Sequence, residues 1–91
     1  MPKVRSFSIH GVECIFHTND HDPPHFHAIK GDDWEFRVWF LRGDKTMLEY
    51  DWHRRKASAK DQKGLITNAK LHRSGLFAEW QRARGIDNAQ A

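Results

Sequence analysis

The stretch HFHAIKGDDWEFRVWF, residues 25–40, gives the strongest structural signal in the chain. Apolar and polar side chains alternate on both sides of a Gly-Asp-Asp turn at residues 31–33, and this pattern predicts a β-hairpin with one face in the core. An antiparallel pairing that buries Phe26 and Ala28 beside Phe36 turns the intervening side chains to the opposite face. That outer face is predicted to carry His25, His27, Glu35, Arg37 and Trp39.

The region before this hairpin follows the same rule. Residues 7–16 alternate around a His-Gly turn, which predicts a shorter N-terminal hairpin. Asn, Asp and two prolines then interrupt the pattern at residues 18–24, because proline cannot donate a backbone hydrogen bond and Asn and Asp favour turns. We therefore expect strand hairpins over residues 1–41, joined by a His-Pro-Pro loop at 20–27.

The second half of the chain changes to helical spacing. Between residues 59 and 84, apolar side chains recur every three or four positions, at Leu65, Ile66, Ala69, Leu76, Phe77, Trp80 and Ala83. Ser58 followed by Asp61 is typical of a helix N-terminus. The Ser74-Gly75 pair is expected to break the helix, which predicts either two short helices or one kinked helix over 59–84. Residues 86–91 have too little apolar content to pack firmly, and we expect them to fray.

These elements define one small domain. A chain of 91 residues is long enough for a single hydrophobic core and too short for two. With a turn at residues 42–45 and a short strand at 47–50, we predict one α+β domain over residues 1–91. In it, C-terminal helices cover one face of an antiparallel sheet of three to five strands. Such an open sheet has exposed edges, so a homodimer formed through an edge strand is compatible with the prediction.

The composition limits the class of protein. The 15 Lys and Arg residues exceed the 12 Asp and Glu residues, giving a net charge of +3 with seven histidines counted as neutral. This charge is uneven, because residues 1–41 carry −2 and residues 42–91 carry +5. No apolar run approaches the roughly 20 residues that span a bilayer, and the single Cys14 cannot form an internal disulfide. We therefore expect a cytoplasmic protein with no membrane partner.

The histidines concentrate in one part of the chain. Five of the seven lie between residues 10 and 27, where two consecutive prolines stiffen the loop that delivers His25. In an enzyme, His25 or His27 would act as acid or base, with Glu35 and Arg37 assisting. The same patch could instead bind a phosphate or a carboxylate, or serve only structure or a protein interface. Whether the protein is an enzyme stays open at this point.

Transition-metal binding is another chemistry that imidazoles favour. His21, His25 and His27 would supply three nitrogen ligands to zinc or another transition metal, and Glu35 could replace His21. The spacing matches no closed four-ligand zinc pattern, so no cofactor is expected and a metal is the alternative. His17 is expected to be an ordinary strand residue.

A basic cluster, WHRRK at residues 52–56, supplies much of the positive charge of the second half. Basic side chains next to an aromatic one favour nucleic acid, and RNA is the expected partner. The predicted binding residues are His21, Trp39, Arg54, Arg55 and Lys56. A solvated helix face is the alternative interpretation of the basic charges.

Three parts of the chain together resemble a known family. The opening MPKV, the motif DHDPPHFHA at residues 20–28 and the stretch LFAEW at 76–80 look like the small prokaryotic domain-of-unknown-function family 4160. The positions that match the family pattern are His21, Pro23, Pro24, His25, His27 and Trp80. The WHRRK run and the Ser74-Gly75 pair are not typical of it. The resemblance implies short strands, the His-Pro-Pro loop, a second hairpin and C-terminal helices.

The same resemblance implies no established activity, but it suggests a role. Family members are often encoded beside another small protein, an arrangement typical of toxin-antitoxin modules. Our hypothesis is a toxin-antitoxin-like protein that acts on or near RNA through the histidine patch of the sheet. The alternative is a non-catalytic protein-binding module, or a metal-binding protein, that pairs with a cognate small protein encoded nearby.

Overall fold

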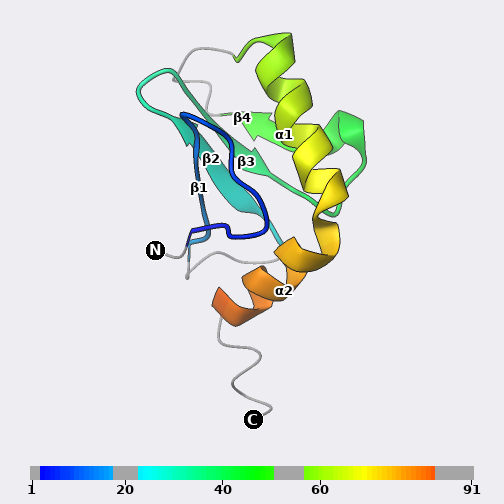
Figure 1. The fold of residues 1–91 in the computed structure, drawn as a ribbon. Helices are drawn as coiled ribbons and strands as arrows, with labels where there is room; N and C mark the ends of the chain where they lie inside the picture. The colour runs from blue at the N-terminus through cyan, green and yellow to red at the C-terminus, as the bar shows by residue number, and fades with distance from the viewer. Residues whose placement is uncertain (1–2, 18–22, 51–56, 84–91) are drawn as a thin grey trace.

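The computed structural model describes residues 3–17, 23–50 and 57–83, and it shows a four-stranded antiparallel sheet followed by two helices (Figure 1). The strands lie in sequence order across the sheet: β1 (Glu13–Ile15), β2 (Phe26–Lys30), β3 (Trp34–Val38) and β4 (Leu48–Tyr50). The remaining elements are the 3-10 helix η1 (Asp44–Thr46) between β3 and β4, and the helices α1 (Ala59–Leu71) and α2 (Arg73–Ala83). The predicted α+β class is therefore confirmed.

The hairpin of β2 and β3 forms as its alternation predicts. Gly31 supplies the turn with a φ of +49°, a left-handed conformation that glycine adopts at little cost. Phe26 pairs with Val38 across the hairpin, and Ala28 pairs with Phe36 in the same register. None of these four residues is more than 1% exposed. The inner face of the sheet is therefore the floor of the hydrophobic core.

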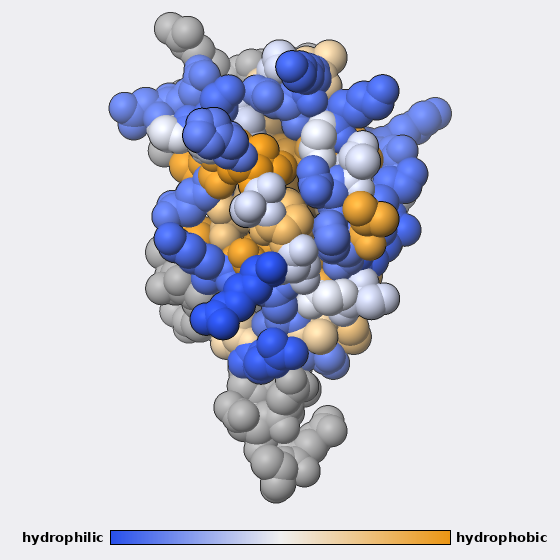
Figure 2. Space-filling model, viewed as in Figure 1, coloured by the Kyte–Doolittle hydropathy of each residue, from blue (hydrophilic) through white to orange (hydrophobic). Residues whose placement is uncertain are grey.

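Both helices share the hydrophobic core with this inner face, and Figure 1 shows α1 beside the sheet and α2 below it. Their buried side chains are Leu65 and Ala69 of α1 and Leu76 and Trp80 of α2. The Asp61 carboxylate also ties α1 to the sheet, because it accepts hydrogen bonds from Lys30 Nζ (3.4 Å) and Trp34 Nε1 (3.3 Å). On the face shown in Figure 2, hydrophilic side chains predominate and apolar ones reach the surface in separate patches. Within the described part of the chain, neither helix is long and apolar enough to cross a membrane.

The predicted N-terminal hairpin is only partly regular. Its turn forms at Gly11, whose φ is +78°. Residues 3–9, however, make isolated bridges rather than a strand. The physical reason is that the backbone N–H groups of Arg5 and Ser6 donate to the Glu79 carboxylate of α2, at 2.6 and 2.8 Å, instead of to a neighbouring strand.

The helical region begins as predicted but breaks at a different residue. Ser58 caps α1, and its Oγ accepts a hydrogen bond from a backbone N–H of the first turn (3.1 Å). The break falls at His72, which has a non-helical φ of −112° and whose imidazole stacks on Phe7 with ring centroids 5.6 Å apart. The Ser74-Gly75 pair lies inside α2, so the predicted position of the break is wrong. The predicted tail at 86–91 lies outside the described residues.

Gly75 is needed for packing instead. A Cβ at this position would lie 2.6 Å from Ser6 Oγ. Ser6 Oγ in turn donates a hydrogen bond to the Glu79 carboxylate, one helical turn further along α2. The missing side chain therefore lets the N-terminal segment lie directly against the helix.

Candidate functional site

The histidine loop leads into β2 and places its imidazoles on the outer face of the sheet. His27 pairs with Ile15 of β1 and with Arg37 of β3, so these three side chains share that face. His25 Nδ1 lies 2.9 Å from Pro23 O, and it must donate this hydrogen bond because a carbonyl only accepts. Both imidazoles are buried, with 4% of His25 and 8% of His27 exposed. The expected open histidine patch is therefore a covered cluster.

Aromatic rings pack around these two histidines. The His27 ring centroid lies 4.0 Å from that of His17 and 5.4 Å from that of His25. The His25 ring lies 4.3 Å from Trp39, measured between ring centroids. We call His17, His25, His27 and Trp39 the outer-face cluster. Ring contacts this close leave little room for water between the imidazoles, which explains their burial.

The predicted partners Glu35 and Arg37 lie at different points around this cluster. Glu35 Oε2 is 3.8 Å from His27 Nδ1, close enough for an ion pair when the imidazole is protonated. Arg37 donates to Glu49 of β4 at 2.8 Å and lies over the Trp39 ring, with Cζ 5.6 Å from the ring centroid. The structure thus brings His27 and Glu35 together and places Arg37 at the exposed edge of the outer-face cluster.

Sequence reasoning misses two residues of this site. His17 is the first, since the sequence predicts an ordinary strand residue there but the side chain lies against His27. Its even spacing from Ile15 indicates the outer face, whereas the register of β1 against β2 is not visible in the sequence. Arg42 is the second: its Cζ lies 4.5 Å from the Trp39 ring centroid, and no local pattern indicates that contact.

Trp39 also carries an unsatisfied polar group. Its indole nitrogen is buried and has no hydrogen-bond partner among the described residues. Leaving a buried donor unbonded costs about 1–3 kcal/mol.

The metal hypothesis depends on a residue beyond this cluster. Among residues 3–17, 23–50 and 57–83, no group of three or more His, Cys, Asp or Glu side chains is arranged to hold a metal ion. His21, the third predicted ligand, lies outside the described residues, as do the predicted binding residues Arg54, Arg55 and Lys56. The three-histidine metal site therefore stays a prediction.

Cys14 is unsuited to nucleophilic chemistry. It pairs with Ala28 on the buried inner face of the sheet. Burial, reinforced by the neighbouring Glu13 carboxylate, raises the pKa of the Cys14 thiol to about 12. Because the thiolate is the reactive form, this side chain is inert at neutral pH.

The fold and the outer-face cluster define a small α+β protein whose sheet carries buried histidines on one face, with two arginines at their edge. A family model described as "Domain of unknown function (DUF4160)" matches residues 11–81. This match covers most of the chain, so the protein belongs to the DUF4160 family, and the resemblance noted in the sequence is confirmed. No curated protein and no solved structure matches the chain.

Proposed function

We propose that the protein binds RNA through the outer face of its sheet and acts as the RNA-directed member of a toxin-antitoxin-like pair. The observation that carries this proposal is the packing of two guanidinium groups, those of Arg37 and Arg42, against the single indole of Trp39. Arginine forms bidentate hydrogen bonds with phosphate oxygens, and its planar group stacks on bases. Both properties are offered at one exposed point of the sheet, where Arg37 would exchange its ion pair with Glu49 for the phosphate.

The exposure of the side chains favours binding over cleavage. Arg37 and Arg42 are exposed, whereas His25 and His27, either of which was predicted to act as acid or base, are buried. A general acid or base must come within about 2.6–3.2 Å of the atom that it serves, which is difficult for a covered imidazole. His25 packs on Trp39, so its role in this proposal is to hold the indole in place for the two arginines.

A further basic side chain, Lys3, lies on the outer face beyond β1. Lys3 forms an isolated β-bridge with Ile15 of β1. Ile15 pairs with His27 of β2, and His27 pairs with Arg37 of β3, so these four residues lie in one row across the sheet. At about 4.8 Å per strand, the Lys3 and Arg37 positions are roughly 14 Å apart on one face. The phosphates of a short single strand would therefore meet basic side chains at both ends of this span.

The proposed role fits the cytoplasm and needs no catalysis by this chain. RNA is a cytoplasmic ligand, and a single unpaired cysteine suits a reducing compartment. A protein that binds RNA, either free or within a ribonucleoprotein, would act in a toxin-antitoxin-like pair without cleaving its target. The basic run at 52–56 is a further RNA contact in this proposal, as the sequence predicts.

Fluorescence anisotropy with a short, 5′-labelled single-stranded RNA tests the proposal. Replacing Arg37 and Arg42 together with Ala should weaken binding about tenfold or more. It should also reduce the slope of log K against log salt by about 1.4, because each lost phosphate contact on a single strand removes about 0.7. The control variant, Lys60→Ala with Lys63→Ala, removes the same charge from α1, on the other side of the sheet. Equal weakening by both variants would refute a specific outer-face site.

The same RNA samples separate binding from cleavage. Electrophoresis after prolonged incubation should show intact RNA in the presence of the wild-type protein. Cleavage that disappears in a folded variant with His25→Gln and His27→Gln would overturn the binding-only mechanism and establish the catalytic alternative. Glutamine is chosen because it retains a polar side chain of similar size within the outer-face cluster.

A further inference from the structure

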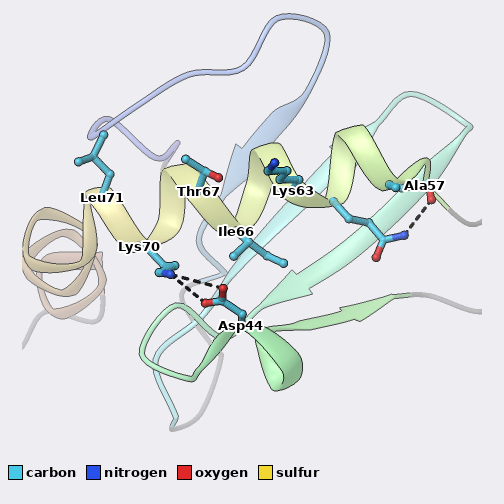
Figure 3. Close-up of a pocket in the computed structure, with 9 residues that line it drawn as sticks. Asp44, Ala57, Lys63, Ile66, Thr67, Lys70 and Leu71 are labelled. Carbon is cyan, nitrogen blue, oxygen red and sulfur yellow. Dashed lines mark hydrogen bonds and ion pairs between the residues drawn. The ribbon is translucent and has the colours of Figure 1, made fainter.

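A groove of about 900 Å³ runs along α1, with η1 along one side of it (Figure 3). One stripe of α1 forms its length, from Ala59 in the first turn to Leu71 at the end of the helix. Asp44 of η1 forms the opposite rim. The groove lies on the helical side of the sheet and shares no lining residue with the outer-face cluster.

The groove exposes apolar surface that the core does not cover. Ile66 lines its centre and is only partly buried. Leu71 lines its end and is 75% exposed, more than any other large hydrophobic side chain in the described part of the chain. Large exposed apolar side chains gathered in a groove, with polar residues around them, mark a contact surface.

The charges of the groove indicate which charge a partner should carry. Lys70 Nζ forms an ion pair with Asp44, at 3.2 Å to Oδ1, so these two charges largely cancel. Lys63 lines the same groove and has no ion-pair or hydrogen-bond partner among the described residues. Lys60 is exposed in the preceding turn of α1 and adds a second positive charge nearby. The groove therefore combines exposed apolar side chains with a net positive charge.

We infer that this groove is the docking site for an acidic amphipathic helix of another protein. Ala59–Leu71 contains 13 residues, which gives α1 a length of about 20 Å. Ile66 and Leu71 lie about 140° apart around α1, on either side of Lys63, so a partner helix of three to four turns lying along α1 would contact them with the two flanks of a broad apolar face. Glu or Asp residues between those two flanks would face Lys63. This inference uses different residues from the RNA proposal and stands without it.

A designed peptide probe tests the groove directly. The probe is a fluorescein-labelled helical peptide of about four turns, with Leu on one face and Glu on the others. A second peptide has the same composition in scrambled order, and a third has Lys in place of Glu. The full-length protein should bind the acidic amphipathic peptide at least tenfold more tightly than either comparison peptide. Equal affinity for the scrambled peptide would overturn the inference.

Matched variants locate the binding site. Leu71→Asp should weaken peptide binding about tenfold, whereas Leu41→Asp, at a leucine that is 49% exposed and outside the groove, should leave it unchanged. Lys63→Glu should weaken binding of the acidic peptide and strengthen binding of the peptide that has Lys in place of Glu. Lys60→Glu makes the same charge change outside the groove lining and should have the smaller effect. If Lys63→Glu does not shift the preference from the acidic peptide towards the Lys peptide, the proposed charge complementarity is refuted.

Two further measurements separate other occupants and the RNA proposal. Sedimentation could show that the wild type is a dimer and that Leu71→Asp is a monomer. That result would assign the groove to a second copy of this chain and overturn the inference. The variant with Arg37→Ala and Arg42→Ala should retain full peptide affinity, while Leu71→Asp should retain RNA affinity. Failure of the RNA-binding test would thus leave the peptide-binding result for the groove intact. Failure of the peptide-binding test would likewise leave the RNA-binding result intact.

Discussion

Replacing Gly75 with Ala should destabilise the protein, although the same change stabilises most helices. Glycine inside a helix costs about 0.5–1 kcal/mol relative to alanine. In α2, however, the added Cβ would lie 2.6 Å from Ser6 Oγ, so Ser6 must rotate and lose its hydrogen bond to the Glu79 carboxylate. A hydrogen bond to a charged group contributes about 1.5–3 kcal/mol. The free energy of unfolding should therefore fall by roughly 0.5–2.5 kcal/mol, the difference between these two terms.

Urea denaturation followed by circular dichroism measures this change against two controls. Gly64 of α1 has nothing within 4 Å of the position that an added Cβ would occupy, so Gly64→Ala should raise the free energy of unfolding by about 0.5–1 kcal/mol. Ser6→Ala removes the clashing oxygen and leaves Ser6 Cβ at 3.5 Å, an ordinary contact distance. In that background, Gly75→Ala should become stabilising. A stabilising Gly75→Ala in the wild type would contradict the role given to Ser6.

Two other side chains give independent predictions. Cys14 should resist iodoacetamide in the folded protein near neutral pH, as measured by mass spectrometry, because its raised pKa keeps the thiol protonated. Since the folded pKa of about 12 exceeds the reference value of 9.0, the contribution of Cys14 to stability is complete below pH 9. It is lost as the pH rises from 9 towards 12, at up to about 1.4 kcal/mol per pH unit, and this fall should be absent in Cys14→Ala. Arg73 donates from Nε to Phe40 O (2.8 Å) and from a terminal nitrogen to Arg42 O (2.7 Å). Arg73→Lys should lower the free energy of unfolding by about 1–3 kcal/mol in urea titrations and weaken RNA binding, because a single ammonium cannot hold both carbonyls. Unchanged RNA affinity would show that Arg42 needs no such support.

Local patterns predict the elements, and long-range contacts decide the details. The β2–β3 hairpin is predictable because burial of Phe26 and Ala28 permits only one choice of face. The helix break is misplaced by local reasoning because the reason for Gly75 lies at Ser6, 69 positions earlier in the chain. The N-terminal strand is overpredicted for the same reason, since Glu79 takes the N–H groups that a strand would have used.

The candidate site shows the same division. Alternation places His25 and His27 on the outer face, but it cannot show that they are buried there. Their burial depends on His17 and Trp39, which come from the segments just after β1 and β3. Arg42 enters the site only through the turn after β3, whose side-chain directions no periodicity specifies.

The short segment after β3 contributes to both proposed binding surfaces. Arg42 lies over Trp39 on the outer face, whereas Asp44, two residues later, forms the rim of the α1 groove and pairs with Lys70. A change at Lys70 would therefore disturb the loop that carries Arg42, and its effect on RNA affinity would mix lost charge with a displaced loop. Lys63 and Leu71 line the groove without bonding to that segment among the described residues. They are thus the positions at which groove and outer face can be perturbed separately.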